Sequence, residues 1–299
     1  MKALANWNRY LSSILLLALT FSASAQINFP WHPNDLNAVV KDYVLRTSVS
    51  GLKDVSISQS IKREGEPIES KPELYTIEYQ ESGVVKRYNK LYANEVFHTI
   101  DYLYLNNRLY REIEKIGSGY MVLQYYYAGD KINHKQFVSR TDSEDLVEIL
   151  ASQDDRPIEN YTHEIIRGEK IQKTIRIDHN RKISFTESES IFNSNTDTLP
   201  HTIKRRYDAN TVYNVWQYTY NDLGKVKSAT NYKSKILAEV YQYSYNEKGK
   251  LKKIARFENE KLLNELEFYY GKNGLLRTCL LVNTESKELL LTDFRYSFY

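Results

Sequence analysis

Three alternating large side chains followed by a turn glycine recur at a step of 25 residues in the last third of the chain. The copies are Trp216, Tyr218 and Tyr220 before Gly224; Tyr241, Tyr243 and Tyr245 before Gly249; and Leu266, Phe268 and Tyr270 before Gly274. Residues at i, i+2 and i+4 of a strand share one face, and glycine adopts the positive φ of a tight reversal at little steric cost. Each copy is therefore predicted to be a β-hairpin.

Similar copies occur elsewhere in the chain. They are Tyr75, Ile77 and Tyr79 before Gly83; Ile100, Tyr102 and Tyr104; Leu123, Tyr125 and Tyr127; and Phe294, Tyr296 and Phe298. The spacing drifts over residues 140–210, where the polar run 186–198 is expected to be a longer loop. The predicted fold class is all-β: consecutive antiparallel β-hairpins, with roughly 14–18 strands, forming a coiled open or barrel-like sheet.

Residues 26–65 form an N-terminal segment ahead of the predicted repeat domain, 66–299. Within this segment, apolar residues at helical spacing in 34–45 predict one short helix. Because the end unit of a repeat array needs cover, the helix is expected to cap the first hairpin.

The first 25 residues have the organisation of an export signal peptide. Lys2 and Arg9 precede the apolar run 14–21, and the small residues 22–25 follow it, so cleavage is expected after Ala25. The apolar run is shorter than the roughly 20 residues that span a bilayer, which disfavours a membrane anchor. The mature chain is thus expected in the periplasm, at the outer-membrane periphery or outside the cell, with no integral membrane span.

The charges of the chain nearly balance. Removal of Lys2 and Arg9 with the signal leaves 39 of the 41 basic residues against 38 acidic ones, a formal charge of +1. A nucleic-acid binder needs a net basic surface that releases counterions, so nucleic acid is not an expected partner. Cys279 is the only cysteine, which excludes an intramolecular disulfide.

The pattern Tyr-x-Tyr-Asn-x-x-Gly-Lys-Val/Leu at 218–226 and 243–251 resembles the tyrosine-aspartate (YD) repeats of Rhs-type and teneurin-like proteins, with Asn221 and Asn246 where aspartate is usual. It is also similar to the Tyr- and Gly-marked hairpins of MORN-like bacterial proteins. The YD resemblance implies a long coiled sheet and roles in adhesion or in enclosing a toxin. It assigns no catalytic residue to this chain.

The sequence contains no recognisable motif for catalysis, for a cofactor or for a metal. Its six histidines lack the i, i+4 pairing or the close Cys/His cluster of a zinc site. Cys279 alternates with Leu281 on a predicted strand, so a packed thiol is a better interpretation than a nucleophile. The protein is therefore expected to be non-enzymatic.

The aromatic face of the predicted hairpins has two interpretations. As core, its rings would stack as cross-strand pairs and bury one face of the sheet. As a binding surface, an exposed row of rings would suit a glycan, a peptide or another sheet. Core is favoured, because the repeats contain few other large apolar residues. The residues that would bind in the second interpretation are Trp216, Tyr218, Tyr220, Tyr241, Tyr243, Tyr245, Phe294, Tyr296 and Phe298.

The last predicted strand, 289–298, is weakly protected by charge, since only Asp293 and Arg295 are charged. If this strand lies unpaired at an edge, it is expected to add a strand of a second copy or of a partner protein. If it pairs instead with an earlier strand, the sheet closes and the edge disappears.

These features favour an exported, non-enzymatic repeat protein that acts as a binding or assembly scaffold in the bacterial envelope. One alternative is an outer-membrane β-barrel, for which predicted strands of about eight residues are short. The other is a secreted hydrolase without a recognisable motif.

Overall fold

The computed structural model of this chain describes residues 51–105, 108–116, 119–128, 131–139, 159–178, 181–194, 197–206, 209–233 and 236–299. The predicted signal peptide, 1–25, and the predicted helix at 34–45 lie outside these residues. The described residues form one antiparallel sheet of 18 strands. The all-β prediction and the predicted series of hairpins are thus confirmed.

The strands follow one another with short connections. They are β1 (Leu52–Lys62), β2 (Glu69–Tyr79), β3 (Val85–Tyr92), β4 (Glu95–Leu105), β5 (Arg108–Ile116), β6 (Gly119–Ala128), β7 (Lys131–Ser139), β8 (Glu159–Arg167), β9 (Ile171–Asp178), β10 (Ile183–Ile191), β11 (Thr202–Arg205), β12 (Asn214–Tyr220), β13 (Val226–Lys233), β14 (Ile236–Tyr245), β15 (Leu251–Glu258), β16 (Lys261–Tyr270), β17 (Leu276–Asn283) and β18 (Leu289–Phe298). Several, such as β1 with 11 residues, are longer than the eight expected.

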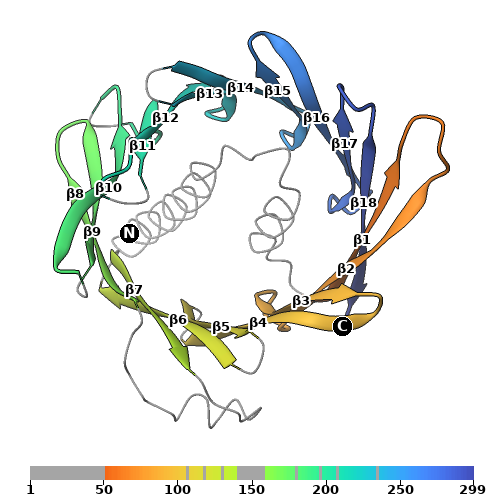
Figure 1. Ribbon diagram of the computed structural model, residues 1–299, viewed down its shortest axis with the longest axis horizontal. Helices are drawn as coiled ribbons and strands as arrows, with labels where there is room; N and C mark the ends of the chain where they lie inside the picture. Colours follow the sequence, from red (N-terminus) through yellow and green to blue (C-terminus); the bar gives the residue numbers. More distant parts are fainter. Residues whose placement is uncertain are drawn as a thin grey trace, which may run out of the picture.

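Each strand pairs with the next one along the chain, and β1 pairs in addition with β18 through ten residue pairs. The strands consequently follow one another around a ring (Figure 1). The backbone pairing between neighbouring strands is shortest between β7 and β8, where two residue pairs are in register.

The pairing of β18 decides between the two alternatives for the strand 289–298, an unpaired edge and a pairing with an earlier strand, in favour of the second. This strand lies between β17 and β1, and its backbone is paired on both sides. The strand therefore offers no free edge to which a second copy or a partner protein could add a strand.

Two boundaries also differ from those expected. β1 falls inside the segment 26–65, because Val55, Ile57 and Ile61 continue the strand alternation without an aromatic marker. β10 overlaps the expected loop 186–198. There Glu189 lies 3.5 Å from Lys173 Nζ and 3.3 Å from Lys204 Nζ, so opposite charges on neighbouring strands replace apolar residues as the cross-strand contacts.

One face of the sheet supplies the core. A single apolar cluster joins residues of β1–β4 to residues of β11–β18, and it includes Tyr75, Tyr102, Trp216, Tyr241 and Phe268. The rings of Trp216 and Tyr241, on β12 and β14, have centroids 5.7 Å apart. Neighbouring positions on the same strands, such as Gln217 and Gln242, are exposed, as expected for a sheet with one buried face.

The repeated glycines reverse the chain at one rim of the ring. In the turn 246–250, Gly249 has φ +71° and its N–H donates to the carbonyl of Asn246 at 2.8 Å. The Asn246 side-chain oxygen accepts the N–H groups of Lys248 and Lys250 at 3.1 and 2.9 Å. Asn221 makes the same contacts in the turn 221–225. We call the rim with the turns 80–84, 221–225, 246–250 and 271–275 the turn rim; the other is the opposite rim.

We expect Gly249→Ala to lower the free energy of unfolding by about 1–2 kcal/mol, because alanine is strained at positive φ. A Cβ there would also lie 2.6 Å from Lys225 Nζ, whereas a Cβ at Gly65, which has φ +77°, would meet nothing within 4 Å. Gly65→Ala is thus a matched control that carries the backbone strain alone. Urea unfolding should show the larger loss for Gly249→Ala. Equal losses would mean that the Lys225 contact contributes nothing, and no loss at Gly249 would contradict the turn.

Candidate functional site: the cationic turn rim

Tyrosine hydroxyls tie successive hairpins together at the turn rim. The Tyr245 hydroxyl donates to the carbonyl of Val226 at 2.8 Å, and the Tyr270 hydroxyl donates to that of Leu251 at 2.9 Å. Tyr220 and Tyr296 make the corresponding bonds to Pro200 and Leu276. Burial raises the pKa of Tyr220 and of Tyr245 to about 12, so both phenols stay neutral and able to donate at physiological pH.

Two turn lysines are part of this framework. The Lys225 ammonium donates to the carbonyl of Gly249 and lies 5.3 Å from the Tyr245 ring centroid. One hairpin further on, Lys250 donates to the carbonyl of Gly274 and lies 5.2 Å from the Tyr270 ring centroid. These contacts hold each turn against the next one. Their ammonium groups are therefore occupied within the protein.

A second set of cations at the turn rim is exposed and has no ion-pair partner among the described residues. Four of them are the extra residues of β-bulges: Lys227, Lys252 and Arg277 follow a turn, and Lys53 lies at the start of β1. The fifth, Arg295, lies near the end of β18. These five, which we call the cationic row, are Lys53, Lys227, Lys252, Arg277 and Arg295. Lys227, Lys252 and Arg277 lie on alternate strands, and two strand spacings separate them by about 9–10 Å.

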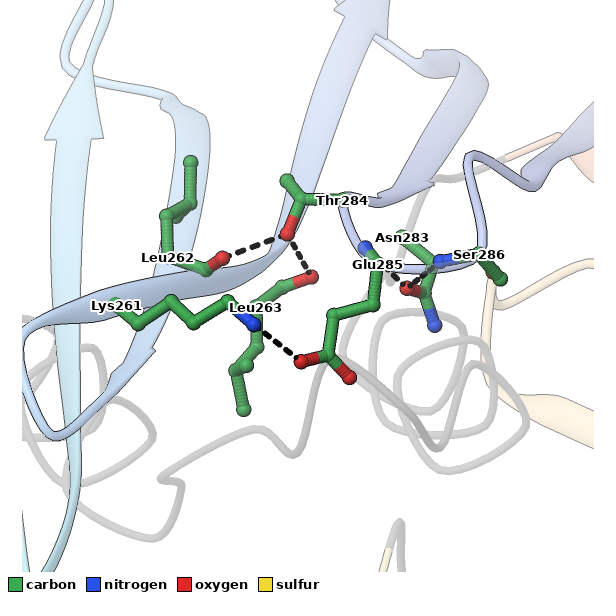
Figure 2. Close-up of polar contacts among 7 residues, drawn as sticks. All are labelled: Lys261, Leu262, Leu263, Asn283, Thr284, Glu285 and Ser286. Carbon is green, nitrogen blue, oxygen red and sulfur yellow. Dashed lines mark hydrogen bonds and ion pairs between the residues drawn. The ribbon is translucent and has the colours of Figure 1, made fainter.

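Three cations of the opposite rim, in the same part of the ring as the cationic row, are paired. Lys261 Nζ lies 2.7 Å from Glu285, Lys287 Nζ lies 2.8 Å from Glu64, and Arg63 Nε lies 3.3 Å from Glu288. Figure 2 shows the Lys261–Glu285 pair beside the turn 284–288, where the Thr284 hydroxyl donates to the carbonyls of Leu262 and Leu263. In the part of the ring formed by β13–β18 and β1, the exposed cations of the turn rim are therefore unpaired, whereas Arg63, Lys261 and Lys287 of the opposite rim are neutralised by carboxylates.

Three open depressions accompany the cationic row. One of ≈480 Å³ lies between the Tyr245 and Tyr270 hairpins and includes Lys248 and Lys252. One of ≈290 Å³ shares Lys252 and Tyr270 with the first and adds Tyr269. A third of ≈430 Å³ lies at the next hairpin; its lining includes Arg277, Phe294 and Tyr296.

Tyr269 differs from its neighbours Phe268 and Tyr270 because its ring is 48% exposed. It pairs with Thr278 of β17, next to the bulge residue Arg277. Its hydroxyl donates to a carboxylate oxygen of Glu267, a bond that raises the pKa of the phenol. An exposed, tethered ring thus lies between unpaired cations of the two neighbouring strands, Lys252 and Arg277.

Most of the aromatic residues proposed as binding candidates from the sequence are packed. Trp216, Tyr218, Tyr241 and Phe294 are buried in the core cluster, with Tyr220, Tyr243 and Tyr296 packed against it. Tyr245 is partly buried, and Phe298 is half exposed. Of these candidates, Tyr245, Phe294 and Tyr296 line the depressions described above.

The sequence interpretation overlooked the cationic row and Tyr269. The signal was present, because Lys227, Lys252 and Arg277 recur at the same 25-residue step as the turn glycines. What the sequence could not show is that these cations lack carboxylate partners, whereas Lys261 and Lys287 have them.

Cys279 is buried, and burial raises the pKa of its thiol, which suits packing better than nucleophilic chemistry. Among the described residues, no group of three His, Cys, Asp or Glu side chains is arranged to hold a metal ion. In the same part of the chain, no helix has the length and apolarity needed to cross a membrane.

No protein-family model matches the chain, and no curated protein matches it. Among solved structures it is similar to a LolA-superfamily protein from Nitrosomonas europaea, with 8% identity, 94% of this chain and 93% of that chain covered, and a TM-score of 0.30. A DUF1329-family protein from Desulfovibrio piger has 10% identity, coverage of 89% and 91%, and a TM-score of 0.22. A putative outer-membrane lipoprotein-sorting protein domain from Vibrio parahaemolyticus has 10% identity, coverage of 87% and 91%, and a TM-score of 0.21. Values this low establish neither a shared fold nor a shared function.

The comparisons correct the resemblance drawn from the sequence. No family model matches the chain, a YD-repeat or MORN model included, so the predicted membership of a YD-repeat or MORN-like family was wrong. The pattern has a local explanation. Asn246 caps the turn, Gly249 supplies the positive φ and Tyr245 bonds to the preceding hairpin. The motif therefore describes a hairpin geometry and not a family.

Two tyrosines on β14 provide a test of the hydroxyl ties. The Tyr245 hydroxyl bonds to Val226, whereas the Tyr243 hydroxyl is buried without a hydrogen-bond partner. We expect Tyr245→Phe to lower the free energy of unfolding by about 1 kcal/mol, because it leaves a carbonyl without its donor. Tyr243→Phe should be neutral or stabilising, because it removes an unsatisfied buried hydroxyl. Thermal unfolding of both variants measures the difference, and a larger loss for Tyr243→Phe would contradict the assigned bonds.

Proposed function

We propose that this chain is an exported, non-enzymatic binding protein of the bacterial envelope and that the cationic row is its binding surface. The N-terminal signal pattern supports export to the periplasm, the outer-membrane periphery or the medium. The ring of hairpins serves as a rigid scaffold that presents the row.

The observation that carries the proposal is the contrast between the rims. The cationic row has no ion-pair partners among the described residues, whereas Lys261 and Lys287 of the opposite rim are paired at 2.7 and 2.8 Å. Unpaired cations held at regular spacing attract an anionic partner and raise its association rate, although exposed charges contribute little to folding. A local row of this kind is compatible with a net charge near zero.

The framework behind the row favours binding over a purely structural role. Lys225 and Lys250 already hold the turns in place, and the tyrosine hydroxyls join the hairpins. The exposed cations beside them are therefore not needed to hold the turns. Because they stand on paired strands, their backbone is ordered before a partner binds, and binding has to order only their side chains.

The test uses the mature protein and immobilised inorganic polyphosphate, an anionic polymer without sugar rings. We expect retention that weakens as salt rises, with a salt dependence reduced by about one unit of slope for each cationic contact removed. Lys252→Gln combined with Arg277→Gln should elute at lower salt than the wild type.

The matched control combines Lys261→Gln with Lys287→Gln, which removes the same number of charges from the opposite rim. This variant should elute close to the wild type. Equal elution of the two double variants, at equal melting temperatures, would contradict a binding surface on the turn rim.

A further inference from the structure

Tyr269 gives the cationic row a feature that charge attraction alone does not require. Its ring is 48% exposed, and it belongs to β16 between the strands that carry Lys252 and Arg277. An exposed aromatic ring presents an apolar face with a polar tip. The site therefore offers stacking in its middle and a cation on each side.

Glu267 adds a hydrogen-bond acceptor at the same place. Its carboxylate accepts the Tyr269 hydroxyl, and Glu267 and Tyr269 both line the ≈290 Å³ depression with Asn246 and Lys252. A carboxylate has lone pairs for further donors beyond the one it accepts here. A ligand at this site should therefore carry hydroxyl donors as well as negative charges.

These requirements separate the candidate polyanions. A phosphodiester backbone can pair with the cations, but it has no hydroxyl donor for Glu267. An anionic membrane surface has no rigid ring to place on Tyr269. An acidic sugar satisfies all three elements: the apolar face of its ring stacks on Tyr269, its carboxylate pairs with Lys252 or Arg277, and its hydroxyls donate to Glu267.

The neighbouring cations extend the site in one direction. Lys227 lies on β13, Lys252 on β15, Arg277 on β17 and Arg295 on β18. Lys227, Lys252 and Arg277 recur at steps of about 9–10 Å, an arrangement that suits a linear polymer better than a single small anion. The ≈480 and ≈430 Å³ depressions lie along the same line of turns.

We propose that the exposed surface at Tyr269, Lys252 and Arg277 is a binding site for a linear acidic polysaccharide of the uronic-acid class, with one sugar ring stacked on Tyr269 and carboxylates paired with the two cations. This inference rests on the proposed binding function and names its ligand class. Tyr269 is a binding residue in it, and Glu267 orients the Tyr269 ring.

The experiment measures binding of the mature protein to a defined oligogalacturonate by calorimetry, with inorganic polyphosphate as a sugar-free comparison. Tyr269→Ala should weaken oligogalacturonate binding by about tenfold or more, because it removes the stacking surface, and should leave polyphosphate binding unchanged. Lys252→Gln combined with Arg277→Gln should weaken both. The matched aromatic control is Tyr92→Ala, which removes a 55% exposed ring from β3 and should change neither.

The results of this experiment distinguish a wrong ligand class from a wrong binding surface. If polyphosphate binding depends on Lys252 and Arg277 but oligogalacturonate binding is absent or indifferent to Tyr269→Ala, the ligand class is wrong and the binding surface stands. Tighter binding of single-stranded DNA, or of vesicles containing phosphatidylglycerol, than of oligogalacturonate would also overturn the ligand class. If the binding of neither polymer depends on Lys252 and Arg277, both the binding surface and the ligand class are wrong. Equal losses for Tyr92→Ala and Tyr269→Ala would remove the assigned role of Tyr269.

Discussion

A sheet of one layer has to pair the backbone on both sides of every strand and remove one of its faces from water. The pairing of β1 with β18 meets the first requirement where the two ends of the described sheet come together. It is supported by a buried polar contact, in which the Gln59 amide donates to the Thr292 hydroxyl at 3.4 Å across 233 positions of sequence. The aromatic face meets the second requirement, because the core cluster continues through this junction from Phe294 to Ile57 and Tyr75.

The position of the candidate site follows from this arrangement. Because the large rings face the core, the bulge residues after the turns 221–225, 246–250 and 271–275 are left for solvent, and there the chain places lysine or arginine. Tyr245 and Tyr270 bond to the preceding hairpins, and Lys225 and Lys250 bond to the following turns, so the rim is held from both directions. The cations exposed on this framework keep a regular spacing because the strands beneath them do.

The sequence predicted what depends on local pattern. The 25-residue step located hairpins with their turn glycines, and the shortage of other large apolar residues correctly favoured a buried aromatic face. Contacts between distant residues were less predictable. No local signal indicated that β1 pairs with β18. The polar sequence of β10 looked like a loop, because its cross-strand contacts are ion pairs of Glu189 with lysines of the neighbouring strands and not apolar contacts. The exposed ring of Tyr269 was also missed, since in sequence it is one aromatic residue among three, Phe268 to Tyr270. Which cations are paired depends on strand register, which composition does not reveal.

Everything proposed for the turn rim requires that the hairpins form one continuous ladder through the β1–β18 junction. Amide hydrogen exchange of the monomeric mature protein measures this directly, because an amide donating to a stable neighbouring strand exchanges slowly and an amide at an open edge exchanges fast. Inward and outward amides of β18 should both be protected, to a degree similar to those of β16. Fast exchange of every second amide along β18, on the side that faces β1, would contradict the ring and with it the shared framework of the rim.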